Sequence, residues 1–120
     1  MEVPLPYGER QMEQRQGNKY VLHIFVSNQS IAMPVADIEV NIDNQQIFHR
    51  EMTTGTQHNW GEVTIPVARG EHIVLITEAK TQTRTSETIN VNQELWIVIK
   101  FSSPPAEFKM DVFDHPVAFM

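Results

Sequence analysis

Two short runs of β-branched and aliphatic residues, joined by a turn that ends at Gly70, occupy residues 61–77 of this chain. Runs of the same kind recur from Tyr20 onward at intervals of roughly ten residues, and each has the length of a strand rather than of a helix. Clusters of Asn, Gly, Pro or Thr separate them, as turns separate strands. The sequence therefore predicts an all-β chain of very low helix content, folded as an antiparallel Ig-like β-sandwich of about seven or eight strands.

The predicted strands either alternate in hydropathy or are apolar throughout. Residues 37–42 alternate most clearly, with isoleucine and valine on one face and polar side chains on the other. Asp43 and Asn44 tolerate a left-handed backbone, so they predict a tight hairpin. A second hairpin is expected around residues 92–93, and the alternating tail 108–120 is expected to add an edge strand. The predicted strands are 20–27, 37–42, 46–51, 61–65, 72–78, 85–91 and 94–101.

Residues 1–19 differ from the rest of the chain. They contain two prolines, two glycines and a polar run in which Met12 is the only apolar residue. Because it has no apolar stripe to dock, this segment is predicted to be a flexible N-terminal arm. Residues 20–120 match a single β-sandwich domain, which is large enough to bury a core without disulfides or a structural metal.

Composition limits the partners and leaves the compartment open. The formal net charge is -6 and the basic residues are scattered, which disfavours nucleic acid as a partner because phosphate binding needs clustered Lys and Arg. The longest apolar runs are too short to cross a bilayer, so no membrane span is expected. The absence of cysteine suits a reducing cytosol and many exported bacterial proteins equally. If Met1 replaces a removed signal peptide, the protein is periplasmic or extracellular, and if Met1 is the native start, it is cytoplasmic.

Three of the predicted strands are apolar on both faces, which an antiparallel strand with one solvated face does not require. Two explanations stay open. Either the C-terminal tail or the N-terminal arm covers the second face, or that face binds a protein partner or a second copy of the chain, since large exposed apolar patches are rare on monomers. The candidate interface consists of Val21, Phe25, His72, Val74, Ile76, Trp96 and Val98.

Part of the chain resembles the prealbumin-like sandwich of transthyretin-like and carboxypeptidase-regulatory-like domains. The likeness lies in Pro34 before small residues at a strand entry, in Gly61 opening a strand, and in Gly70 before a long strand. The resemblance implies a sandwich of about seven strands that serves as an accessory, binding or stabilising module, with no catalytic residue to carry over. The chain departs from the pattern at His72, where an aromatic residue is usual, and in the tail after Phe101.

The nearest approach to a ligand site is His58, Asn59 and Trp60, which close a polar loop. An indole beside amide and imidazole groups would stack on a sugar ring and hydrogen-bond its hydroxyls. The alternative is structural. Trp60 would then plug the open end of the sandwich, and the two preceding side chains would make turn hydrogen bonds.

The histidines and acids do not predict a metal site or an active site. No short ligand spacing is found among His23, His49, His58, His72 and His115. His23 and His72 would meet only if their strands paired. No nucleophile motif or phosphate-binding glycine loop is present, and Asp111 and Asp114 are interpreted as solvating acids. No catalytic residue, metal ligand or cofactor is therefore predicted.

These observations favour a non-enzymatic binding or structural β-sandwich module, such as an exported bacterial accessory protein that recognises protein or glycan. The alternative is a small metal-binding protein or a hydrolase that uses the region of His58 and His72. A third interpretation is a homo-oligomer, in which case Trp96→Ala or Val74→Asp would change the mass in solution without unfolding the protein. If either variant merely unfolds, the second face is ordinary core.

Overall fold

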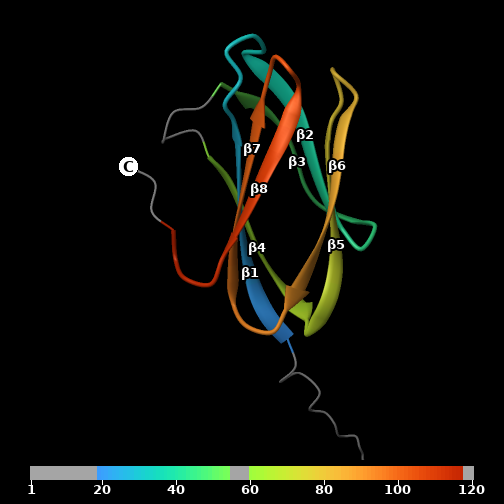
Figure 1. Cartoon of the computed structure of the whole chain (residues 1–120), viewed down its shortest axis with the longest axis vertical. Coiled ribbons are helices and arrows are strands. Elements are labelled where there is room, and N and C mark those ends of the chain that lie inside the picture. Colours follow the sequence, from blue (N-terminus) through green and yellow to red (C-terminus); the bar gives the residue numbers. More distant parts are fainter. Residues whose placement is uncertain (1–18, 55–59, 118–120) are drawn as a thin grey trace, which may run out of the picture.

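A computed structural model describes residues 19–54 and 60–117, which form eight strands in two sheets that pack face to face (Figure 1). These two ranges contain no helix, and so no helix that could span a membrane. The predicted all-β sandwich is confirmed. Its strands are β1 (Lys19–Asn28), β2 (Val35–Ile42), β3 (Gln45–Thr53), β4 (Gly61–Ala68), β5 (Gly70–Glu78), β6 (Thr83–Val91), β7 (Leu95–Ser102) and β8 (Glu107–Phe113).

The two sheets have the strand orders β4-β1-β7-β8 (sheet I) and β3-β2-β5-β6 (sheet II). All neighbouring strands are antiparallel except β1 and β7, which run parallel. The parallel pair is a departure from the wholly antiparallel sandwich that the sequence predicted. It arises because the chain visits sheet II between β4 and β7, so that β7 enters sheet I on the free side of β1.

The core lies between the sheets and is built from the inward positions of the strands. In β2 the predicted alternation is confirmed, because Ile38 and Val40 have no exposed surface while the residues between them are only half-buried. On β4, Gly61 lies so close to Phe48 of the other sheet that an added Cβ would come within 2.6 Å of the phenyl ring. The buried apolar core comprises Leu22, Ile24, Val26, Ala36, Ile38, Val40, Ile42, Met52, Val67, Val74, Ile76, Ile89, Val91, Leu95, Ile97, Ile99 and Phe101.

Two connections show how turn chemistry fixes the path of the chain. Asp43 and Asn44 have φ values of 51° and 69°, the left-handed conformations of a two-residue hairpin, and they join β2 to β3 as predicted. Only Arg69 separates β4 in sheet I from β5 in sheet II. Gly70 follows it with a φ of 123°, a conformation that side chains disfavour, so this abrupt change of sheet needs glycine.

The hairpin predicted around residues 92–93 is wrong. β6 pairs only with β5 in sheet II, whereas β7 pairs with β1 and β8 in sheet I, so residues 92–94 cross between the sheets. A polar turn between two apolar runs has the same local chemistry whether the next strand pairs or crosses over. The edge strand predicted in the tail is confirmed, since β8 pairs with β7.

The face assigned to β5 also needs correction. Val74 and Ile76, taken as members of an outer interface, have no exposed surface and lie in the core. The outward residues of this strand are Ile73, which is 53% exposed, and Leu75. Residues 73–76 are all apolar, so hydropathy does not indicate which of them face the core. Pairing with β2 decides which side of the strand faces inward.

The predicted domain boundaries are only partly covered by the described residues. Residues 1–18 of the predicted arm lie outside them, and Lys19, which the sequence placed in the arm, is the first residue of β1. The sandwich itself extends from Lys19 to Phe113, with residues 114–117 following β8.

Candidate functional site

The outer face of sheet I is aromatic and apolar along its centre. The parallel register places Val98 beside Phe25 and Trp96 beside His23. Four members of the predicted interface share this face: Val21, Phe25, Trp96 and Val98. The other three members do not, because their strand belongs to sheet II.

His23 and Trp96 form a stacked pair on this face. Their ring centroids are 4.9 Å apart and their planes are inclined by 7°. Nε2 of His23 lies 2.6 Å from the Glu94 carboxylate, which accepts its hydrogen bond and orients the imidazole. The ring contact and the hydrogen bond together hold both side chains in place on this face without a bound ligand.

Beside this stack, an open groove of about 430 Å³ lies over β7 and β8. Its floor contains Val98, which is only 4% exposed. One wall is Trp60, which directly precedes β4, and another is the chain after β8, which turns back along the sheet (Figure 1). The lining residues are Trp60, Val98, Lys100, Asp111, Phe113, His115, Pro116 and Val117.

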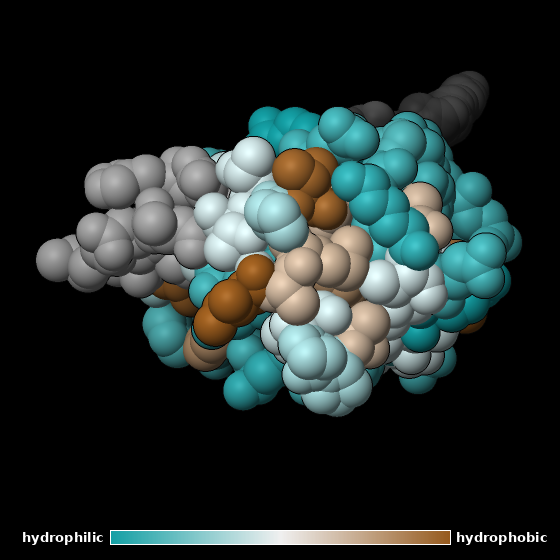
Figure 2. Space-filling model, turned by 90° about the horizontal axis from the view of Figure 1, so that it is seen from above, coloured by the Kyte–Doolittle hydropathy of each residue, from teal (hydrophilic) through white to brown (hydrophobic). Residues whose placement is uncertain are grey.

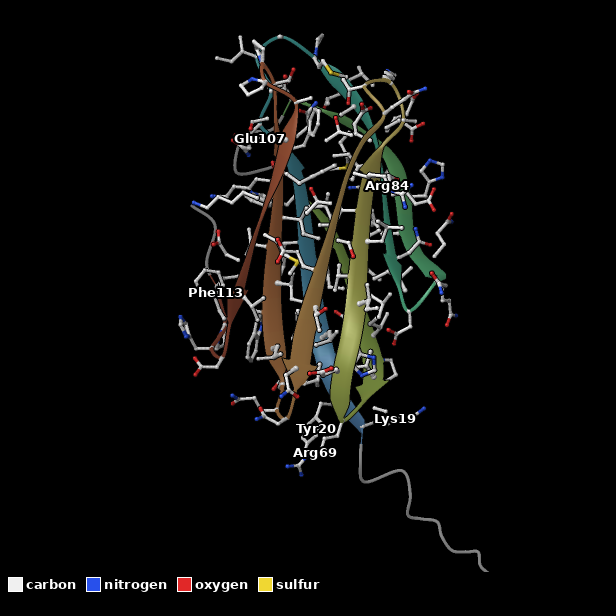
Figure 3. All side chains as sticks on the ribbon, turned by 45° about the vertical axis from the view of Figure 1, so that its right-hand side comes forward. Lys19, Tyr20, Arg69, Arg84, Glu107 and Phe113 are labelled. Carbon is white, nitrogen blue, oxygen red and sulfur yellow. The ribbon has the colours of Figure 1, made fainter. Side chains whose placement is uncertain are left out.

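The groove combines ring surfaces with a few polar groups. Phe113 projects from the end of β8 (Figure 3), and the His115 ring packs edge-on to it with centroids 5.6 Å apart. Asp114 accepts a 3.0 Å hydrogen bond from His115, and this bond lowers the pKa of the Asp114 carboxyl. Lys100 and Asp111 add an ammonium donor and a carboxylate acceptor. Such a groove can stack an apolar ring face and hydrogen-bond polar substituents.

Only one of the three loop residues that suggested a ligand site lies within the described ranges. His58 and Asn59 are outside them, while Trp60 is partly buried. Trp60 lies over the outer face of sheet I and does not plug the open end of the sandwich, because the groove that it lines is floored by outward residues of β7. The tail residues of the groove were missed by sequence reasoning. The one available signal was Phe113, which falls in phase with Asp111 on the outward side of β8.

A second cavity, of about 330 Å³, opens near the β2–β3 turn and contains His72. Nδ1 of His72 lies 2.5 Å from the Asp43 carboxylate, and Nε2 lies 2.6 Å from the carbonyl oxygen of Ala68. Because both partners only accept hydrogen bonds, both ring nitrogens carry a proton when both bonds are made. The bond to Asp43 raises the pKa of His72 against the opposing effect of partial burial, and the same bond lowers the pKa of Asp43.

Through these two hydrogen bonds His72 links the two sheets, and the three residues His72, Asp43 and Ala68 are called the clasp below. Asp43 belongs to the turn after β2 in sheet II, whereas Ala68 ends β4 in sheet I. Neither ring nitrogen is left to accept a substrate proton or to bind a metal ion. His23 and His72 do not meet, because their strands lie in different sheets. Within residues 19–54 and 60–117, no group of three His, Asp or Glu side chains is arranged to hold a metal ion.

Glu78 is a further residue that the sequence did not single out. Its side chain has no exposed surface. Burial opposes ionisation, but hydrogen bonds from the backbone N–H of Asp37 and from the hydroxyl and N–H of Thr81 outweigh it, so the pKa of Glu78 is lowered. The carboxylate ties the β5–β6 turn to β2 and is wholly used by the fold.

Comparison with protein families and curated sequences adds no assignment to the fold that the structure shows. A scan against protein-family models found no match, and a search of curated protein sequences found no significant similarity. The architecture is an all-β sandwich of two sheets compatible with an Ig-like fold. Function is therefore argued from the chemistry of the groove and of the surfaces around it.

Proposed function

We propose that this protein is a non-enzymatic binding module with a prealbumin-like scaffold, and that its groove on the outer face of sheet I holds a saccharide. The scaffold is supported by two four-stranded sheets in which the first and seventh strands are parallel neighbours. The ligand site is supported by one observation above all. Trp60 and Phe113, far apart in sequence, line the same groove together with Lys100 and Asp111.

The groove suits a sugar in both chemistry and size. The C–H faces of a pyranose stack on indole and phenyl rings, and its hydroxyls both donate and accept hydrogen bonds. Lys100 supplies donors and Asp111 supplies acceptors at the same place. The volume of about 430 Å³ is at the small end of ligand pockets, which favours one or two sugar units over a larger ligand.

The enzymatic and metal-binding alternatives receive less support from the same side chains. His72 already hydrogen-bonds Asp43 and Ala68 through its two nitrogens, so it has no free nitrogen for either role. In the groove, Lys100 and Asp111 are the charged groups over β7 and β8, and neither is paired with a nucleophile among the lining residues. These contacts favour a structural role for His72 and a binding role for the groove.

Glycan-array screening of the full chain, followed by calorimetry on the best saccharide, tests the proposal. Trp60→Ala is expected to weaken binding by about tenfold or more, because it removes a stacking wall. Trp96→Phe is the matched control, since it changes an aromatic residue on the same face outside the groove and keeps a ring beside Phe113. Circular dichroism verifies the fold of each variant. The proposal fails if no saccharide binds or if both variants bind as tightly as the parent.

A further inference from the structure

The second cavity, of about 330 Å³, lies between the edges of the two sheets. β3 is the outer strand of sheet II, and β4 is the outer strand of sheet I. Near the start of β4 the two edges close on each other, since Gly61 packs tightly against Phe48. Toward the β2–β3 turn, which projects at the side of the sandwich (Figure 1), both sheets contribute walls to the cavity. A small ligand can therefore enter from the side without parting the core.

A β-bulge in β3 shapes one wall of this cavity. The partners of Gln46 and Phe48 are consecutive residues of β2, so Ile47 is left without a partner in that ladder. A bulge bends its strand and redirects the side chain at that position. Ile47 is half-buried, packs against the core and lines the cavity. The irregular pairing of β3 therefore supplies the cavity with an extra aliphatic side chain.

Most of the cavity wall is aliphatic. Ile42 and Val67, which are only 5% and 8% exposed, belong to the buried core, and Ile65 packs against it. Among the described residues that line the cavity, none carries a phenyl, phenol or indole ring, in contrast to the groove on sheet I. The walls therefore suit an aliphatic chain rather than a stacked ring. The volume is at the small end of ligand pockets, so the chain must be short.

Asp43, Gln45 and His72 form the polar end of the cavity. The Asp43 carboxylate accepts hydrogen bonds from Nδ1 of His72 and, at 2.9 Å, from the N–H of Ile73. A carboxylate has about four acceptor positions, so about two are left for a ligand. The side chain of Asp43 is 49% exposed, which leaves it within reach of a ligand. Both nitrogens of His72 are engaged in the clasp, so His72 has no donor left for an anionic ligand.

These polar groups favour a ligand whose head donates hydrogen bonds and is positively charged. An ammonium group has three donors, which the carboxylate of Asp43 and the side-chain carbonyl of Gln45 can accept. Hydrogen bonds between ammonium and carboxylate groups are stronger than those between neutral groups. The net charge of -6 also attracts a cation to the protein and repels an anion. The clasp can stay closed, because ligand and His72 use different acceptor positions of the carboxylate.

We propose that this cavity binds a small aliphatic amine, with its chain between β3 and β4 and its ammonium group on Asp43. The cavity shares no lining residue with the groove of sheet I, so the proposal stands independently of saccharide binding. The aliphatic walls account for the body of the ligand, and the free acceptor positions of Asp43 account for its charge.

NMR titration of the full chain with n-hexylamine at neutral pH tests this inference. Hexanoate, which has an aliphatic chain of similar length and the opposite charge, is the control ligand. Hexylammonium is expected to bind saturably and to shift the backbone amide signals of β3 near Ile47 and of β4 near Ile65. Hexanoate is expected to bind more weakly by about tenfold or more, because the carboxylate of Asp43 repels it.

Two substitutions test the two ends of the ligand separately. Asp43→Asn keeps a residue that tolerates the left-handed turn, and is expected to weaken hexylammonium binding by about tenfold because it removes the charge. Ile47→Ala truncates one wall without changing a cross-strand pair, and is expected to weaken binding by about fivefold. Ile31→Ala is the matched control and leaves binding unchanged. Ile31 is 93% exposed in the β1–β2 loop, at the largely hydrophilic end of the sandwich that Figure 2 shows.

Amide spectra of the free variants verify that each is folded. Trp60→Ala, in the groove, is expected to leave hexylammonium binding unchanged, so the two proposed sites are tested separately. The inference is overturned by shifts that do not saturate or that spread over the acidic surface. It is equally overturned if hexanoate binds as tightly as hexylammonium, or if either Asp43→Asn or Ile47→Ala binds as tightly as the parent.

Discussion

The two outer faces of the sandwich cover the same core but differ in chemistry. On sheet II the outer face of β2 and β3 is polar and paired within itself, since His49 donates to Asp37 at 2.7 Å and Asn41 donates to Glu39 at 2.8 Å. On sheet I the outer face carries the stack of His23 on Trp96 and the groove beside Trp60. A face whose polar groups satisfy one another offers little to a ligand, whereas a half-covered aromatic face offers both area and unfilled space.

Both sheets contain strands that are apolar on both faces, but the outward apolar residues differ in exposure between the two sheets. In sheet I, the outward residue Val98 of β7 is only 4% exposed, and it lines the groove together with Trp60 and with Pro116 and Val117 of the chain after β8. In sheet II, the outward residue Ile73 stays 53% exposed. The second face is therefore buried at Val98 in sheet I and exposed at Ile73 in sheet II.

The largest expected effect separates the two sides of β5. Val74→Asp places a carboxylate where no surface is exposed, so it is expected to destabilise the fold by at least about 4 kcal/mol. Ile73→Asp, at the next residue on the outer face, is expected to cost about 0.5 kcal/mol or less. Urea unfolding followed by tryptophan fluorescence measures both. Equal losses from the two substitutions would contradict the assignment of faces.

A smaller effect is expected from the buried carboxylate that joins β5 to β2. Glu78→Ala leaves the N–H groups of Asp37 and Thr81 without their acceptor in a buried place, which is expected to cost about 2 to 3 kcal/mol of unfolding free energy. Glu71→Ala, at an exposed position of the same strand, is the control and is expected to change it little. If the two variants unfold at the same urea concentration, the carboxylate does not hold the turn.

Much of the fold could be predicted because local patterns carry it. The alternation of β2 fixed its buried face, and the chemistry of Asp43 and Asn44 fixed the hairpin. Local pattern could not decide whether the chain after Val91 pairs or crosses to the other sheet, since the turn residues are the same in both cases. Nor could it decide the phase of β5, where both faces are apolar.

The candidate site was less predictable than the fold. Trp60 was recognised as a ligand-type residue, but its partners in the groove come from β7, β8 and the tail. They meet only through sheet pairing and through the return of the chain after Phe113, neither of which leaves a spacing in the sequence. The 93% exposure of Ile31 was also missed. Its loop is held by hydrogen bonds of the buried Asn28 and Ser30, whose burial the sequence pattern does not reveal.

The clasp between the sheets predicts a dependence of stability on pH. The pKa of His72 is raised in the folded protein, so its contribution is complete below its ordinary value of 6.5 and is lost as pH rises through the raised value. The pKa of Asp43 is lowered, so its contribution is complete above 3.8 and is lost as pH falls through the lowered value. The clasp therefore makes its full contribution to stability between pH 3.8 and pH 6.5.

Thermal unfolding across this range tests the clasp. The parent is expected to lose about 1 kcal/mol as the pH rises above 6.5, a modest value because water screens the half-exposed Asp43. His72→Ala is expected to be less stable at pH 6 and to lack this step, whereas His49→Ala, an exposed histidine of sheet II, retains it. A step that survives in His72→Ala would assign the pH dependence to another group.

The smallest expected effect is the difference in stability lost when a histidine is removed from each of the two outer faces. His23 stacks on Trp96 and donates to Glu94, with 23% of its side chain exposed, whereas His49 donates to Asp37 with 47% exposed. His23→Ala is expected to cost about 1 kcal/mol, because it removes a ring contact as well as a hydrogen bond. His49→Ala is expected to cost about 0.3 kcal/mol, since a solvated pair contributes little. Urea unfolding at pH 7 resolves this difference, and equal costs would mean that the aromatic face of sheet I is no better packed than the polar face of sheet II.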